Sequence, residues 1–545
     1  MGNPRILEDE LQVYEALAQT LIDEGVSDLF GLIGDGNLFL VDAFTKKSGT
    51  RYVSAAHETG AVLMAKGYAS VTGRVGVATV TYGPAVSNTV TALIECARDG
   101  VPVVLIAGDT AAEDRHNLQN LPQRDIILPT GAGFEQVRSS ETATADLATA
   151  LRRAAREQGP IVLNVPVDLQ NADVAYSPAP SVPRVSPFAH PSREAVEDAV
   201  AVIAASSRPI ILAGRGATSA GGSLERLSER IGAPLATTLR SRDLFRHSPY
   251  NLGIFGTLST TGALSAIGQS DCIIVFGASL NVWTTDKGAL LAGKRIVHVD
   301  RRFQQLASMV TPTAGVVGDS AAAAGEFLEV LDEAGVGQGN FRDWDLSWYQ
   351  TRRYTRPLDD AAPIQFPVAL DFLEEAVPES RTLIADAGRF FSPAMATFRV
   401  QRPQDFVHTA NIGSIGLGMG SAVGAAVGRP ESPALLVCGD GGFMHGGLAE
   451  FNTAVRHGLD LIVLVFNDGG YGAEHIQFRD RAMDPSLSLL EWPQFAQLAD
   501  ALGGRGITVR IVGDLDDAAQ AIKERDGALL IDVMLDPDSM TRPER

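Results

Sequence analysis

Cysteine is scarce in this sequence: the 545 residues include three, Cys96, Cys272 and Cys438. They are far apart in the chain, which does not suit a disulfide framework or a zinc cluster. Each has apolar neighbours. We therefore expect buried thiols in a reducing compartment and predict a cytoplasmic protein.

Long hydrophobic runs are also absent. No segment reaches the roughly 18 uncharged apolar residues of a membrane span, and the first ten residues, MGNPRILEDE, lack the apolar core of a signal peptide. Positive charge is in deficit, with 45 Lys and Arg against 65 Asp and Glu and a formal net charge of −20. Such a surface repels phosphate backbones and anionic lipids, so we expect neither nucleic-acid nor membrane partners.

The sequence does contain short apolar, β-branched runs that alternate with longer helical patterns, which is typical of parallel sheets covered on both faces. The runs are 75–82, 101–108, 161–166, 209–214, 272–278, 295–300, 382–388, 434–440, 459–467 and 528–535. Proline-rich residues 177–192 and the glycine-, charge- and aromatic-rich residues 335–363 interrupt them. We predict an α/β protein of three domains, each a mostly parallel sheet covered by helices: 1–176, 193–334 and 364–545.

Two glycine-rich strand ends carry the strongest functional signal. Gly439-Asp440-Gly441-Gly442 precedes a helix predicted over 447–457, and Asn467-Asp468-Gly469-Gly470-Tyr471 ends the next strand. Ligands bind at such strand ends, where glycine lets the backbone approach a phosphate and a helix N-terminus faces it. Two side-chain oxygens and one carbonyl form a partial ligand set that suits Mg²⁺. The first turn alone would also fit a simple strand-to-helix connection.

This pair of motifs resembles the signature of thiamine-diphosphate (ThDP) enzymes, in which Gly-Asp-Gly is followed further along the chain by Asn-Asn. The resemblance implies that Mg²⁺ is held by Asp440, Asp468 and the Gly470 carbonyl. Asp468 departs from the usual asparagine: it still offers an oxygen but adds a negative charge beside the diphosphate. Further cofactor contacts are expected at Gly439, Gly441, Gly442 and Tyr471.

A second feature lies in the first domain, where residues 57–69 are HETGAVLMAKGYA. Alanine at every fourth position predicts a helix with a small-residue stripe, and Glu58 lies at its start. An isolated carboxylate among apolar neighbours favours a partner that shares its proton, although the helix dipole alone also favours glutamate there. In the ThDP family, a glutamate in this context bonds the cofactor's pyrimidine ring and promotes loss of the thiazolium C2 proton, a role that the resemblance assigns to Glu58.

Other segments resemble the family's cofactor-binding turns. Residues 82–88, YGPAVSN, resemble its GPG-x-x-N turn, with Ala85 in place of the second glycine. Residues 413–418, GSIGLG, resemble the segment that supports the bent cofactor. By this resemblance Ile415 lies under the two rings and the Gly413 carbonyl meets the amino group. Cofactor contacts are also expected at Tyr82, Asn88, Asp386 and Gly388.

The resemblance covers the whole chain and matches the pyruvate decarboxylase, benzoylformate decarboxylase and acetolactate synthase branch. It implies non-oxidative decarboxylation of a 2-oxo acid, followed by protonation of the enamine or its carboligation to an aldehyde or 2-oxo acid. Glu474 and His116 align with decarboxylase residues near the reacting carbon and are candidate acid/base catalysts. Each could equally be a solvated loop residue.

The alternative is an acetolactate synthase that condenses two pyruvates and carries FAD, because residues 123–125 faintly resemble that enzyme. Gly214-Arg215-Gly216 after a strand would fit a dinucleotide, but the arginine- and aspartate-rich FAD segment is not found near residues 278–285, so FAD is not favoured. A non-catalytic relative is disfavoured because Glu58, Asp440 and Asn467 are all present. In the family the first and last domains meet across a subunit interface, so a homodimer or homotetramer with active sites at the dimer interface is expected.

Overall fold

The computed structural model describes residues 10–180, 190–341, 344 and 356–538. The described residues form two compact units: the first contains 10–180, 356–398 and 407–538, and the second contains 190–341, 344 and 399–406. The central part of the predicted linker over 177–192, and much of the break over 335–363, lie outside the described residues.

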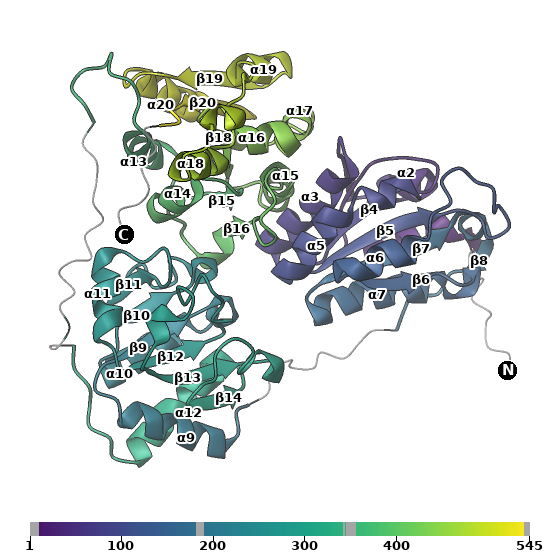
Figure 1. Ribbon diagram of the computed structural model, residues 1–545. Helices are drawn as coiled ribbons and strands as arrows, with labels where there is room; N and C mark the ends of the chain where they lie inside the picture. The colour runs from purple at the N-terminus through teal and green to yellow at the C-terminus, as the bar shows by residue number, and fades with distance from the viewer. Residues whose placement is uncertain (1–9, 181–189, 342–343, 345–355, 539–545) are drawn as a thin grey trace, which may run out of the picture. The chain divides into compact units, whose positions relative to one another are not determined.

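The N-terminal sheet of the first unit has six strands in the order β3-β2-β4-β5-β7-β6, all paired in parallel (Figure 1). Its strands are β2 (Asp28–Gly31), β3 (Arg51–Ser54), β4 (Gly76–Val80), β5 (Val103–Asp109), β6 (Gly133–Gln136) and β7 (Pro160–Pro166). The connecting helices are α1 (Val13–Asp23), α2 (Leu38–Thr45), α3 (Glu58–Thr72), α4 (Pro84–Ser87), α5 (Val90–Asp99), α6 (Gln123–Ile127), α7 (Ala143–Glu157) and α8 (Val167–Gln170). A small antiparallel pair joins β1 (Glu10–Gln12) to β8 (Asp173–Ala175).

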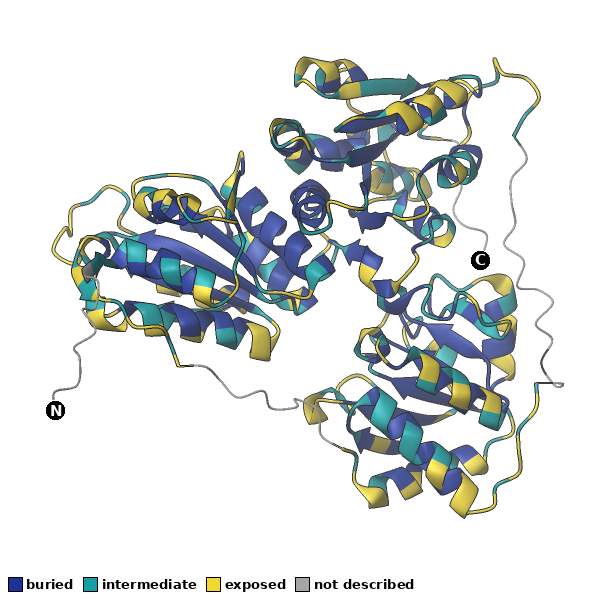
Figure 2. Cartoon of the chain, turned by 180° about the vertical axis from the view of Figure 1, so that it is seen from behind, coloured by how far each residue is buried: buried dark blue, intermediate teal, exposed yellow. Residues whose placement is uncertain are grey.

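Two separate apolar clusters cover the faces of this sheet. One contains buried residues of α1, α2 and α7, and the other contains those of α3 and α5. Helix α7 buries Ala143, Leu147, Ala150 and Leu151, the spacing of an amphipathic helix with one apolar stripe. Figure 2 shows the inner strands in dark blue and teal and yellow residues on the outer faces of most helices.

The C-terminal sheet of the first unit also has six strands, in the order β16-β15-β17-β18-β20-β19. They are β15 (Thr382–Ala385), β16 (Phe406–His408), β17 (Ala434–Gly439), β18 (Leu461–Asn467), β19 (Arg505–Val509) and β20 (Leu529–Met534). The helices are α13 (Phe366–Ala376), α14 (Phe391–Thr397), α15 (Gly418–Gly428), α16 (Asp440–Gly442), α17 (Leu448–Arg456), α18 (Gly472–Asp480), α19 (Phe495–Ala501) and α20 (Asp514–Glu524).

The second unit contains one parallel sheet of six strands in the order β11-β10-β9-β12-β13-β14. Its strands are β9 (Pro209–Ala213), β10 (Leu235–Thr237), β11 (Asn251–Ile254), β12 (Cys272–Phe276), β13 (Arg295–Asp300) and β14 (Ala314–Val317). Its helices are α9 (Arg193–Ala204), α10 (Gly221–Ile231), α11 (Thr261–Gln269) and α12 (Ser320–Glu333).

The glycine turn of this middle sheet is explained by backbone packing. A Cβ on Gly214 would overlap the carbonyl of Gly277, and a Cβ on Gly216 would lie 2.9 Å from the Gly277 Cα. Gly277 itself has φ +60°, a conformation that favours glycine. The glycines therefore allow two loops to approach each other and do not by themselves indicate a dinucleotide site.

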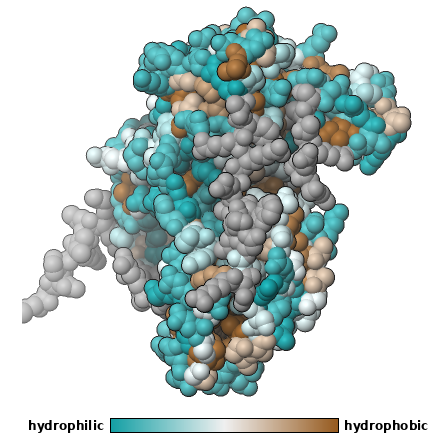
Figure 3. Space-filling model, turned by 90° about the vertical axis from the view of Figure 1, so that its left-hand side faces the viewer, coloured by the Kyte–Doolittle hydropathy of each residue, from teal (hydrophilic) through white to brown (hydrophobic). Residues whose placement is uncertain are grey.

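The predicted fold class is confirmed: three six-stranded, largely parallel sheets are covered by helices. On the face shown in Figure 3, hydrophobic residues form small, separate patches within a mainly hydrophilic surface. All three cysteines are buried and free. Among the described residues, no helix combines the length and apolarity needed to cross a membrane.

Candidate functional site

Asp440 lies at the carboxyl end of β17, where the buried strand gives way to the short helix α16. Its side chain is buried, and its Oδ2 accepts hydrogen bonds from the Gly470 N–H (2.8 Å) and the indole Nε1–H of Trp492 (2.8 Å). Gly470 follows the neighbouring strand β18, so the hydrogen bond joins the two strand ends on which the predicted metal site depends.

The second predicted ligand, Asp468, directly follows β18 and is also buried. The preceding residue has a structural role: Asn467 Nδ2 donates to Asp532 Oδ1 (2.9 Å), and its Oδ1 accepts from the Gly469 N–H (3.1 Å). These bonds fix the turn that presents Asp468. The Gly470 carbonyl faces the α16 turn, since a Cβ on Gly441 would lie 3.7 Å from that oxygen.

These donors fit a divalent cation. Burial, together with the charge of Asp468, raises the pKa of Asp440 to about 7, and burial raises the pKa of Asp468 to about 6. Two neighbouring buried carboxylates repel each other. A cation between them would offset both this repulsion and the cost of burying the two charges. Within the described part of the chain no group of three His, Cys, Asp or Glu side chains could hold a metal, so the third oxygen must come from backbone, ligand or water, as Mg²⁺ commonly accepts.

The glycines of the α16 turn are packed closely by the protein on one side. A Cβ on Gly441 would lie 2.8 Å from the ring of Tyr471, and a Cβ on Gly442 would lie 3.0 Å from Asp386 Oδ2. Gly439 provides the extended residue before the helix. A side chain at either tight position would displace these neighbours, so glycine keeps this turn compact.

Asp386 follows β15 and holds the segment predicted to support the cofactor rings. Its carboxylate accepts from the N–H groups of Ala387 (2.8 Å) and Gly416 (2.9 Å), and burial raises its pKa to about 6. Gly413 (φ +74°) and Gly416 (φ +81°) both adopt the left-handed conformation, and Ile415 is half-buried between them. The predicted contact residue Gly388 lies two residues beyond Asp386, in the same strand-end turn.

Glu58 begins α3, as the sequence predicted, and His57 caps the helix by accepting the Thr59 N–H (3.1 Å). Glu58 Oε2 accepts a hydrogen bond from Asn88 Nδ2 (3.0 Å), which joins two predicted cofactor residues. Tyr82 is buried at the end of the strand that leads into the same turn. The Glu58 side chain remains 13% exposed.

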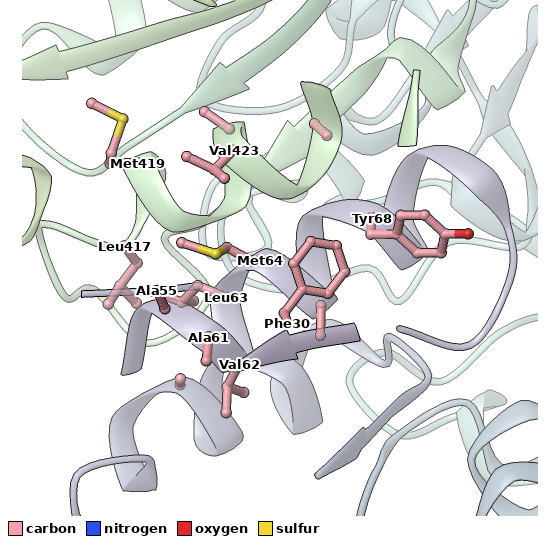
Figure 4. Close-up of a cluster of buried hydrophobic side chains, with 14 of the residues drawn as sticks. Phe30, Ala55, Ala61, Val62, Leu63, Met64, Tyr68, Leu417, Met419 and Val423 are labelled. Atoms are coloured by element: carbon pink, nitrogen blue, oxygen red, sulfur yellow. The ribbon is translucent and has the colours of Figure 1, made fainter. Parts of the chain in front are cut away.

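Helices α3 and α15 pack against each other, and Figure 4 shows hydrophobic side chains of both, such as Met64 and Val423, in one buried cluster. Glycines of α15 bring the two backbones close together. Gly420 lies beside Gly60 and Leu63, Gly424 lies against the Met64 carbonyl, and Gly428 lies beside Val71 and Thr72. Residue numbers increase in the same direction along both helices at these contacts, so the two helices run parallel. Glu58 at the start of α3 and the Gly413–Leu417 segment before α15 therefore lie at the same end of the helix pair.

A buried carboxylate locks this arrangement. Glu450 of α17 accepts the N–H groups of Ala56 (3.1 Å) and His57 (3.1 Å), immediately before Glu58. A Cβ on Gly60 would overlap Glu450 Oε1, so only glycine leaves room for this contact. The helix that follows the metal turn therefore holds the start of the helix that carries Glu58.

A second buried cluster supports the segment before Gly413. Lys66 Nζ lies 3.2 Å from Glu95 Oε1 and 2.9 Å from Asp99 Oδ2, and it donates to the His408 carbonyl (2.6 Å). Glu95 also accepts the backbone N–H (3.0 Å) and side-chain amide (2.6 Å) of Asn411. Burial lowers the pKa of Lys66, but attraction to both carboxylates outweighs it, so the net shift is upward.

The two acid/base candidates are exposed. His116 lies in the loop that follows β5, and Glu474 lies in the first turn of α18. Within the described residues no hydrogen bond or ion pair connects either of them to Glu58. Their catalytic roles stay predictions.

Sequence reasoning missed several residues that the fold brings to the site. Trp492 bonds Asp440, and Arg389 Nη1 lies 3.6 Å from Asp468 Oδ2. Gln123, noted only as part of a faint resemblance, accepts the Gly83 N–H (2.6 Å) and borders a polar cavity of about 320 Å³ at the ends of β5 and β7. The sequence signal for Gln123 was that faint resemblance, and the signal for Arg389 was its position directly after the predicted run 382–388. Trp492 belongs to no local motif.

Comparison with protein families identifies three matching regions. Residues 11–128 match the N-terminal TPP binding domain of thiamine pyrophosphate enzymes, residues 196–331 match their central domain, and residues 386–533 match their C-terminal TPP binding domain. Glu58 falls in the first region, and the carboxylates Asp440 and Asp468 fall in the last.

Among similar proteins, the acetolactate synthase large subunit of Mycobacterium tuberculosis (strain CDC 1551 / Oshkosh) is 27% identical, over 97% of this chain and 89% of the relative. The sulfoacetaldehyde acetyltransferase of Castellaniella defragrans is 27% identical, over 94% and 90% respectively. The acetolactate synthase large subunit of Corynebacterium glutamicum is 26% identical, over 97% and 87%. With all three family regions present in order, this chain belongs to the thiamine pyrophosphate (thiamine diphosphate) enzymes.

Proposed function

We propose that this enzyme uses ThDP and Mg²⁺ to decarboxylate a 2-oxo acid and then protonates the product or joins it to an aldehyde or second 2-oxo acid. The observation that carries the proposal is the parallel packing of α3 on α15, because it brings Glu58 to the end of the helix pair where the Asp386-anchored turn lies. Glu58, the proposed activating acid, and the Gly413–Leu417 turn, the proposed support of the cofactor rings, would then lie on either side of the bound cofactor.

The residues present divide the binding task by chemistry. Asp440, Asp468 and the Gly470 carbonyl would hold Mg²⁺, which in turn would hold the diphosphate beside the α16 N-terminus. Glu58, oriented by Asn88, would share a proton with the pyrimidine ring. Ile415 would support the ring system. Bound ThDP would supply a carbanion that adds to a ketone carbon and accepts the electrons released when carbon dioxide leaves.

The acceptor in the second half of the reaction separates the alternatives. Relatives named acetolactate synthase and sulfoacetaldehyde acetyltransferase support a transfer to a second molecule, so carboligation is at least as well supported as simple protonation. An acetolactate synthase with FAD remains the second candidate. Purified protein with the absorption of a flavin and acetolactate formation from pyruvate would favour it.

The direct test combines binding and turnover. Titration calorimetry of the chain with ThDP in the presence of Mg²⁺ should give saturable binding, and a panel of 2-oxo acids with and without aldehydes should release carbon dioxide or ligated product. Glu58→Gln should abolish turnover while retaining cofactor binding. Glu431→Gln, which changes an exposed glutamate, is the matched control. Full activity of Glu58→Gln would refute its role and favour a different reaction.

We further propose a homodimer, or a dimer of dimers, in which the α3–α15 contact forms between subunits. In the single chain this contact joins the two sheets of the first unit. The same surfaces can pair with a second copy without any change in their chemistry, which is the basis of domain exchange. The three buried, unpaired cysteines support a reducing compartment such as the cytoplasm.

A further inference from the structure

Arg389 lies in the turn after β15, three residues beyond Asp386, and its side chain is 11% exposed. Its Nη1 is 3.6 Å from Asp468 Oδ2 and donates to the Pro537 carbonyl (2.7 Å). The guanidinium is therefore fixed beside the carboxylate that is predicted to bind the metal. Because arginine retains its charge in proteins, this is a permanent cation in the site.

The packing around this pair leaves little freedom. A Cβ on Gly472 would overlap Asp468 Oδ2 and lie 3.1 Å from Arg389 Cδ. Glycine at the first residue of α18 thus makes room for both side chains at once. The pair is consequently a built feature of the turn between β18 and α18, unlike an exposed ion pair that forms and breaks in solvent.

The Arg389–Asp468 pair affects the net charge of the proposed cofactor site. An aspartate at 468 carries one more negative charge than the asparagine expected there, and that charge lies next to Asp440 and to the location of a polyanionic diphosphate. At short range in a partly buried site, an uncompensated charge of this kind opposes an anionic ligand. Arg389 supplies one positive charge and restores the balance that an asparagine would give.

We propose that Arg389 is a positioning residue of the cofactor site, which neutralises Asp468 so that two carboxylates can hold a metal beside a diphosphate. This inference rests on the proposed ThDP function. Under this proposal the Arg389 charge is needed only when residue 468 is a charged aspartate, and not when it is a neutral asparagine. Its consequence is that the two positions depend on each other in cofactor binding.

The test is a double-mutant cycle read by binding. Affinity for ThDP at saturating Mg²⁺ is measured by calorimetry in the unmodified chain, Arg389→Gln, Asp468→Asn and the double variant. Arg389→Gln should bind about 10- to 100-fold more weakly, the usual range for groups that support a metal ligand. The double variant should regain most of that loss, because the charge that needed compensation is gone.

The controls separate this inference from its premise. Arg481→Gln removes an exposed arginine from the end of α18 and should bind like the unmodified chain. Arg389→Gln affinity within about threefold of the unmodified chain, or a double variant as weak as Arg389→Gln, would overturn the pairing. Failure of the unmodified chain to bind ThDP would instead refute the proposed function. In that case titration with Mn²⁺ alone decides: Arg389→Gln should bind Mn²⁺ more tightly, and unchanged Mn²⁺ affinity would overturn the inference as well.

Discussion

The buried cluster around Lys66 gives the sharpest prediction of stability. Lys66→Met removes the cation that Glu95 and Asp99 share, and both carboxylate side chains are at most 1% exposed. Breaking a buried ion pair from one side costs about 3–5 kcal/mol. At about 1.4 kcal/mol per factor of ten, amide exchange that requires opening of α3 or α5 should accelerate by roughly a hundredfold to a few thousandfold.

Hydrogen–deuterium exchange followed by mass spectrometry measures this effect peptide by peptide. Lys46→Met is the matched control: Lys46 also pairs with an aspartate, Asp42, but both side chains are largely exposed, and exchange should not change measurably. Adding Asp99→Asn to Lys66→Met should slow exchange again, because one of the stranded charges is removed. Exchange in α3 and α5 within about threefold of the unmodified chain would show that the cluster's charges are not coupled to its stability.

Four further outcomes are expected. Gly60→Ala should force the Glu450 carboxylate away from the α3 start and lower the thermal midpoint by several degrees, and an unchanged midpoint would contradict the packing. Burial raises the pKa of Asp386 to about 6 from 3.8, so its stabilising contribution is complete below pH about 4 and is lost as the pH rises to about 6. Asp386→Asn should therefore flatten the fall in thermal midpoint over that range, and a parallel curve would exclude this group as the cause. Removal of divalent ions with EDTA should abolish saturable ThDP binding in calorimetry, and added Mg²⁺ should restore it; retained binding would count against a metal-held diphosphate. Co-expressed Glu58→Gln and Asp440→Asn chains should regain up to about a quarter of normal activity if sites form between subunits, whereas no activity would indicate sites within one chain.

Most inner strands of the sheets could be predicted from sequence, but the edge strands could not, and the short inner strands β2 and β10 were missed although they are fully buried. β17 and β18 are continuous apolar runs because helices cover both sides, and the predicted runs coincide with them. Edge strands such as β3, β6 and β19 have polar, half-exposed residues and no such run, so they were not predicted. Their place in the sheet comes from pairing with a buried neighbour.

The candidate site shows the same division. Glu58 and Asp440 stand in local motifs, and the structure places them at the helix start and strand end that the sequence indicated. Arg389 and Trp492 lie far along the sequence from the carboxylates that they contact. Each residue meets its carboxylate only through the folding of the C-terminal sheet. A pattern within a single segment contains no information about such pairs.

The glycine contacts between α3 and α15 also affect how the chain can be handled. Because α15 covers one side of the buried helix α3, a fragment ending at the linker after residue 176 would present that apolar side of α3 to water. The N-terminal sheet has its own core, yet it is not an independent module. We expect such a fragment to self-associate or precipitate, and vectors that express the parts separately would need to supply both in the same cell.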